Sequence, residues 1–124
     1  TMSGDIGDDI DSFIIGYINT KEWSKKGLIG GIKLGVNSDG KEHHIATVTN
    51  MPDHIRSMLT LSSMRVPVLD EKFLRKVLVV DGQELSGRNQ LIMHAVVDWE
   101  RGFRETKSAK DCVLNLDIIK QEAF

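Results

Sequence analysis

The chain contains few residues that cross-link or interrupt small proteins, with one cysteine and two prolines in 124 residues. A single cysteine cannot form an internal disulfide, and Cys112 alternates with Leu114 and Leu116 in an apolar pattern. We therefore expect an inert core thiol and a reducing compartment, cytoplasmic or nuclear. The longest dense apolar runs, 13–18 and 77–80, are too short to span a bilayer. The acidic beginning of the chain has no apolar signal core, which argues against secretion by the common route.

Strong net charge is also missing, since the chain carries a formal charge of −2. Four of its 18 acidic residues fall within the first twelve positions, namely Asp5, Asp8, Asp9 and Asp11. The other residues hold all 16 basic side chains and the remaining 14 acidic ones, so this part is about +2, well below a strongly basic nucleic-acid footprint. We expect an acidic mobile leader over 1–12 and a single β-rich domain over 13–124. A leader that masks a basic surface is the alternative.

Strand signals dominate the first half of that domain. Residues 13–19 could begin as strand or helix, and their Ile and Tyr content with Gly16 in the middle favours a strand. Residues 28–36 alternate between apolar and other positions, and 41–49 are rich in Thr, Ile and Val. The Asn-Ser-Asp-Gly sequence at 37–40 between them predicts a β-hairpin.

One segment, about residues 52–64, has the pattern of a helix. Pro52 suits a first helical turn, Asp53 complements the helix dipole, and Pro67 closes the element. The expected inward stripe consists of Ile55, Met58, Leu59 and Ser62.

Three further strands are predicted toward the end of the chain. Residues 77–80 form an apolar run that ends in Asp81-Gly82, which is typical of a buried strand followed by a turn. Residues 91–99 alternate, and the expected inward face holds Leu91, Met93, Ala95, Val97 and Trp99. Residues 112–118 repeat this pattern as a last strand.

Together these elements predict a mainly β fold with a minor α component. The expected architecture is a small antiparallel β-barrel or sandwich of about six strands, with one helix between the third and fourth strands. An oligonucleotide-binding-type barrel has a helix at the same place in its order of elements.

No catalytic, metal or cofactor site is expected. Residues 35–41 match most of a phosphate-binding loop, but Glu42 stands where the magnesium-binding hydroxyl should be and a strand follows where a helix is needed. His43 and His44 are adjacent in a predicted strand, so their side chains point to opposite faces and cannot both bind one ion without distorting it. Nothing resembles a nucleophile elbow. We therefore expect a protein that is not an enzyme.

Two segments combine basic and aromatic residues, which single-strand binders use for phosphate contacts and base stacking. The candidate binding residues are Trp23, Lys25 and Lys26 in segment 21–26, and Arg101, Phe103, Arg104, Lys107 and Lys110 in segment 99–110. The competing interpretation is that 99–110 is a solvated hairpin whose charged tip protects a strand edge, and that Trp23 packs into the core.

The first functional hypothesis is therefore a non-enzymatic binding or assembly protein that acts through protein–protein contact and self-association. The alternative is a nucleic-acid-binding β-barrel that uses the segments 21–26 and 99–110.

Overall fold

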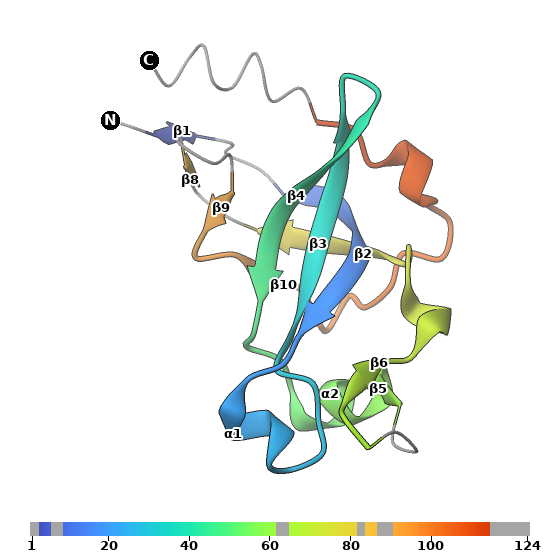
Figure 1. The fold of residues 1–124 in the computed structure, drawn as a ribbon. Helices are drawn as coiled ribbons and strands as arrows, with labels where there is room; N and C mark the ends of the chain where they lie inside the picture. Colours follow the sequence, from blue (N-terminus) through green and yellow to red (C-terminus); the bar gives the residue numbers. More distant parts are fainter. Residues whose placement is uncertain (1–2, 6–8, 62–64, 82–83, 87–90, 115–124) are drawn as a thin grey trace.

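The computed structural model describes residues 3–5, 9–61, 65–81, 84–86 and 91–114. Its centre is a five-stranded antiparallel sheet, which confirms the mainly β class (Figure 1). In spatial order the strands are β10 (Val96–Val97), β7 (Val77–Asp81), β2 (Ile10–Ile18), β3 (Gly31–Ser38) and β4 (Lys41–Val48).

Two small sheets and four short helices complete the described fold. The small sheets contain β1 (Ser3–Asp5), β8 (Glu84–Ser86) and β9 (Ile92–Met93), and separately β5 (Thr60–Leu61) and β6 (Val68–Leu69). The α-helices are α1 (Lys21–Ser24) and α2 (Asp53–Leu59), and the 3-10 helices are η1 (Glu71–Phe73) and η2 (Ala109–Asp111). None of the described helices is long and apolar enough to cross a membrane.

The main sheet has Greek-key connectivity. Strands β2, β3 and β4 follow one another along the chain, and β7 then returns after a long connection to lie beside β2. That connection contains α2, so a helix does lie between the third and fourth strands of the main sheet, as expected. Strands β10 and β4 remain the two outer strands, so the sheet is not closed and the barrel stays a prediction.

The β3–β4 hairpin is the element best encoded by local sequence. Ser38 pairs with Lys41, and the two residues between them, Asp39 and Gly40, have φ of 52° and 75°. Positive φ at both turn positions is typical of a type I′ turn, for which Asp-Gly is a preferred sequence. The predicted hairpin is confirmed.

Residues 13–18 lie in the strand β2, but that strand begins earlier than expected. Ile10 pairs with Val80 of β7, and the buried Ser12 Oγ donates a 3.0 Å hydrogen bond to the Leu78 carbonyl. Positions 10–12 therefore belong to the sheet and not to the acidic leader. The expected leader of 1–12 is too long at its end, because residues 10–12 pair with residues of β7 that are 66 or more positions away, and such a pairing has no local signal in the sequence.

Helix α2 is shorter than the predicted 52–64. Thr60 and Leu61 leave the helix and pair with Leu69 and Val68 of β6, while 62–64 lie outside the described residues. Leu59 is buried as expected, but Met58 is 44% exposed because the buried face of this short helix is the one that carries Arg56 and Leu59. The helix α1 was not predicted.

The alternation over 91–99 holds only in part. Val97 is 3% exposed and Val96 is 59% exposed, as expected, but Ile92 is buried where an outward position was predicted. His94 has a φ of 57°, which ends β9 and changes the inward face before β10 begins. Of the last predicted strand, 112–118, the structure describes 112–114, where Val113 forms an isolated parallel bridge with Asn37. Residues 115–118 lie outside the described residues.

The sheet carries a core on each side. The larger core includes Ile14, Ile32, Leu34, Ile45 and Leu78, all fully buried. The smaller core lies on the opposite face, where Phe13 and Val77 pack with Ala109 and Cys112. This second core holds the segment around η2 against the main sheet.

Candidate functional site

A basic cleft of about 500 Å³ lies where two segments distant in sequence meet. It is lined by residues 74–77, at the start of β7, and by residues from 104 to 110, before and within η2. Its lining contains five cationic side chains and one carboxylate, from Glu105; the cations are Arg75, Lys76, Arg104, Lys107 and Lys110. We call this site the basic cleft.

Backbone hydrogen bonds and the smaller core bring these segments together. The Arg104 amide donates to the Val77 carbonyl at 2.9 Å, and the Arg75 amide donates to the Ile14 carbonyl at 2.8 Å. The buried side chains of Ala109 and Cys112 anchor η2 beneath Phe13. The cleft is thus positioned by the sheet and not by a free loop.

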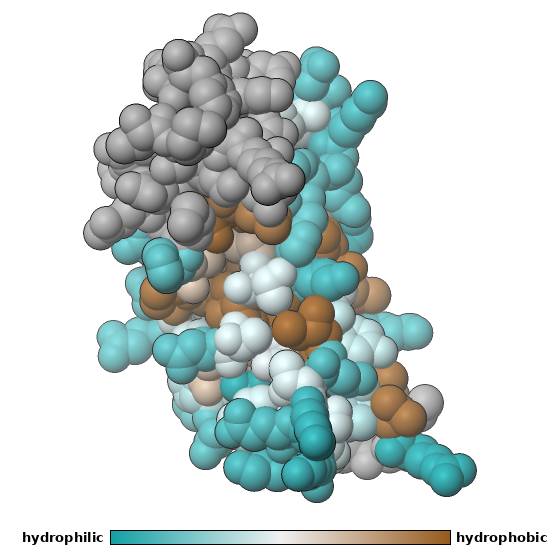
Figure 2. All heavy atoms as spheres, turned by 60° about the vertical axis from the view of Figure 1, so that its left-hand side comes forward, coloured by the Kyte–Doolittle hydropathy of each residue, from teal (hydrophilic) through white to brown (hydrophobic). Residues whose placement is uncertain are grey.

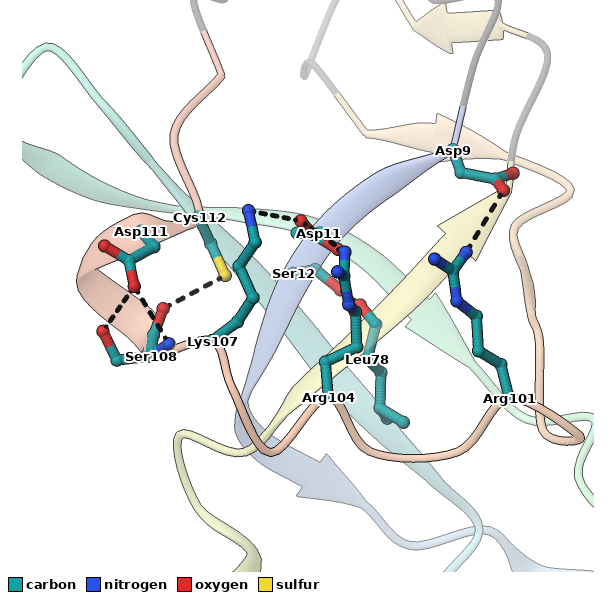
Figure 3. Close-up of polar contacts among 10 residues, drawn as sticks. All are labelled: Asp9, Asp11, Ser12, Leu78, Arg101, Arg104, Lys107, Ser108, Asp111 and Cys112. Atoms are coloured by element: carbon teal, nitrogen blue, oxygen red, sulfur yellow. Dashed lines mark hydrogen bonds and ion pairs between the residues drawn. The ribbon is translucent and has the colours of Figure 1, made fainter.

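Asp11 of β2 neutralises one side of the cleft (Figure 3). Both of its carboxylate oxygens accept from Nη1 of Arg104, at 2.8 and 3.1 Å, and Nζ of Lys107 lies 3.2 Å from Oδ2. Burial alone would raise the pKa of Asp11, but the hydrogen bonds from Arg104 and Lys107 outweigh it and hold the pKa below its ordinary value. A second acidic residue, Asp9, lies 4.0 Å from Arg101.

The other two ion pairs of the cleft are solvent-exposed. Arg75 lies 3.1 Å from Glu42 of β4, and Lys76 lies 3.5 Å from Glu105. Such pairs contribute at most about 1 kcal/mol each. A phosphate group could therefore displace these carboxylates at small cost.

The structure gathers three of the candidate residues of segment 99–110 in the cleft, namely Arg104, Lys107 and Lys110. Arg101 is not in the lining and pairs with Asp9 instead. Phe103 does not stand at an exposed hairpin tip, because it is half-buried and stacks on Phe73 with ring centroids 5.7 Å apart. The segment is therefore packed along the sheet, and the expected stacking by Phe103 is obstructed.

The other predicted cluster, in segment 21–26, has a structural partner. Two cationic side chains lie over the Trp23 ring. Cζ of Arg56 is 3.8 Å and Nζ of Lys26 is 4.6 Å from the ring centroid. Lys25 is exposed on the same short segment, and none of these residues lines the basic cleft. The two predicted segments thus do not form one site.

Arg56 itself was missed from the sequence. Its side chain is only 2% exposed and donates to the carbonyls of Ile29, Gly30 and Thr49 at 2.9, 2.6 and 2.7 Å. Burial lowers the pKa of Arg56, and the three carbonyls and the Trp23 ring offset the cost of a buried charge. Arg56 therefore fastens α2 to the chain on both sides of β3–β4.

Arg75 and Lys76 were missed as site residues for a different reason. They form a basic pair between Phe73 and the apolar strand β7, a signal visible in the sequence. Nothing local connects this pair to 104–110, however.

Among the described residues, two kinds of chemical site come into question: a reactive thiol and a metal centre. Cys112 is fully buried, and burial raises the pKa of its thiol to about 11, so it is protonated near neutral pH. Among the described residues no group of three or more His, Cys, Asp or Glu is placed to hold a metal ion. In comparisons with known proteins, no family model matches the chain and no curated protein is significantly similar to it.

Proposed function

We propose that this chain is a non-enzymatic binding module for single-stranded nucleic acid, with backbone phosphates in the basic cleft. The observation that carries the proposal is the convergence of five cationic side chains from 75–76 and 104–110 on one concave surface. Clustered Lys and Arg in a groove are the feature that lets single-strand binders follow a phosphate backbone.

The strand order supports the same proposal. A five-stranded, partly open Greek-key barrel is the architecture of the oligonucleotide-binding fold, which binds ligands on its second and third strands and adjoining loops. The corresponding strands here are β3 and β4, and the cleft adjoins both of them. Arg75 pairs with Glu42 of β4, and Asn37 of β3 donates to the Ala109 carbonyl at 2.9 Å. Because one fold can serve many functions, this similarity adds to the evidence of the cations and does not replace it.

The salt dependence of binding tests the proposal directly. A fluorescein-labelled fifteen-nucleotide oligo(dT) should bind at low salt, and its affinity should fall steeply as salt rises, because neutralised phosphates release counterions. Three to five phosphate contacts predict a slope of log K against log[salt] of about −2 to −3.5 for a single strand. Fluorescence anisotropy measures both quantities. An absence of binding at low salt would refute the proposal, and a flat salt dependence would rule out the cleft cations as its basis.

Protein–protein contact with self-association, the first hypothesis from the sequence, remains the second candidate. It is favoured by the open sheet, whose outer strands β4 and β10 could each pair with another chain. Figure 2 turns the side bearing β4 and β9 forward and shows apolar atoms at the surface among hydrophilic ones. The exposed Val96 of β10 adds apolar surface at an outer strand.

For this candidate we expect a molar mass that rises from monomer toward dimer across the micromolar concentration range. Light scattering coupled to size-exclusion chromatography measures it, and the charged substitution Val96→Glu should shift the equilibrium to monomer. A monomer mass at every concentration would eliminate self-association.

A further inference from the structure

We propose that a second site, the groove between β2 and the β5–β6 hairpin, binds a segment of another protein that presents an apolar side chain next to Lys or Arg. The groove has a volume of about 720 Å³ and is lined by residues 15–17 of β2, by Leu61 of β5 and by residues 68–71 and Leu74 around β6 and η1. The proposal is independent of nucleic-acid binding, because only Leu74 lines both this groove and the basic cleft.

The groove exists because β2 changes partners along its length. Its pairing with β7 ends at Phe13, whereas its pairing with β3 continues to Ile18. Across this opening, β5 and β6 pair with each other. Within the described residues, Gly16 and Tyr17 of β2 are therefore paired on one side only, with β3, and Ile15 lies at a register shift in that pairing.

Both ends of this opening are closed by hydrogen bonds. At one end the Ile14 amide donates to the Lys76 carbonyl at 3.1 Å, and at the other Nδ2 of Asn19 donates to the Pro67 carbonyl at 3.0 Å. A strand of full length cannot add to an edge that is closed at both ends. The groove suits instead the side chains of a short segment that enters from outside.

The lining defines the chemistry of that segment. Ile15, Tyr17, Leu61 and Val68 are half-buried, and Leu74 is 42% exposed, so an apolar side chain would cover surface that is now open to water. The charged residues of the lining are Asp70 and Glu71, both acidic. Asp70 accepts from the Lys72 amide and lies 3.8 Å from Lys72 Nζ, and this exposed ion pair is weak enough for a partner's cation to replace. Carboxylates at the margin of an apolar groove favour a neighbouring Lys or Arg.

The same charges argue against two other occupants. A nucleic-acid phosphate would be repelled by Asp70 and Glu71. A symmetric pairing of two copies through this groove would bring the same acidic residues of both copies toward one another, which is unfavourable. The partner is therefore a different, basic and apolar segment.

NMR titration with three matched peptides tests this proposal. The probe is the tripeptide acetyl-Lys-Phe-Lys-amide, acetyl-Glu-Phe-Glu-amide keeps the anchor and reverses the charge, and acetyl-Lys-Gly-Lys-amide keeps the charge and removes the anchor. We expect saturable shifts of the backbone amides of 15–17 and 68–74 with the first peptide alone. Shifts located elsewhere, equal shifts from the Glu peptide, or no shift at millimolar peptide would overturn the proposal.

Two exposed apolar residues provide a matched pair of variants. Leu74→Ser should weaken binding of the Lys-Phe-Lys peptide by about tenfold, because an apolar contact in the groove is lost. Val113 is 68% exposed and does not line the groove, so Val113→Ser should leave the affinity for this peptide unchanged. Both side chains are exposed, so both variants should remain folded. Equal affinity of the two variants would place the peptide outside the groove. Because the readout is peptide binding, failure of oligonucleotide binding would not affect this result.

Discussion

Replacement of Lys76, Lys107 and Lys110 together by Glu should weaken oligonucleotide binding by at least about 100-fold at low salt. All three residues line the basic cleft, and each substitution removes a phosphate contact and adds a repelling carboxylate. Lysines are chosen because Arg104 is the least exposed of the ion-paired cations and helps to hold the segment on the sheet. Fluorescence anisotropy with the labelled oligo(dT) measures the loss, and circular dichroism checks that the variant is folded.

Segment 21–26 provides a control with the same change in charge. Replacement of Lys21, Lys25 and Lys26 by Glu also changes the net charge by −6, but these lysines do not line the basic cleft. We expect this variant to lose much less affinity, through the change in net charge alone. If it loses binding while the cleft variant retains it, the site lies at α1. Equal losses would indicate non-specific attraction.

Phe13→Ala should lower the free energy of unfolding by about 3 to 5 kcal/mol. Phe13 of β2 is fully buried in the smaller core, where it packs against the segment that carries η2. The Arg75 guanidinium lies over its ring, 4.8 Å from the ring centroid. Its removal leaves a cavity beneath η2 and deprives Arg75 of its aromatic support, so stability and the shape of the cleft should suffer together. Urea denaturation measures the first effect, and oligo(dT) affinity under native conditions measures the second.

Val113→Ala is the comparison for this substitution. Val113 lies next to Cys112 along the chain but is 68% exposed, so we expect a change within about 0.5 kcal/mol. A loss below about 1 kcal/mol for Phe13→Ala would mean that η2 is not held by the smaller core.

The elements that could be predicted are those in which local sequence and final structure agree. The Asp39-Gly40 turn and the alternation of Ile32, Leu34 and Val36 encode the β3–β4 hairpin within about twenty residues. The apolar run 77–80 likewise became the buried strand β7. Errors arose where pairing with another segment decided the outcome. Residues 10–12 belong to β2 because they pair with β7, and α2 ends at Leu59 because Thr60 and Leu61 pair with β6.

The mainly β class, the main hairpin, the burial of Cys112 and the basic residues of segment 99–110 all follow from the local pattern of residues. Contacts between distant elements set which of those basic residues lie together in the basic cleft. Asp11 and Arg104 are 93 residues apart, and their contact depends on the packing of β2, β7 and the segment around η2 against one another. Arg75 and Lys76 join the cleft for the same reason. Side-chain periodicity indicates which face of an element is buried, but it does not indicate which distant element covers that face.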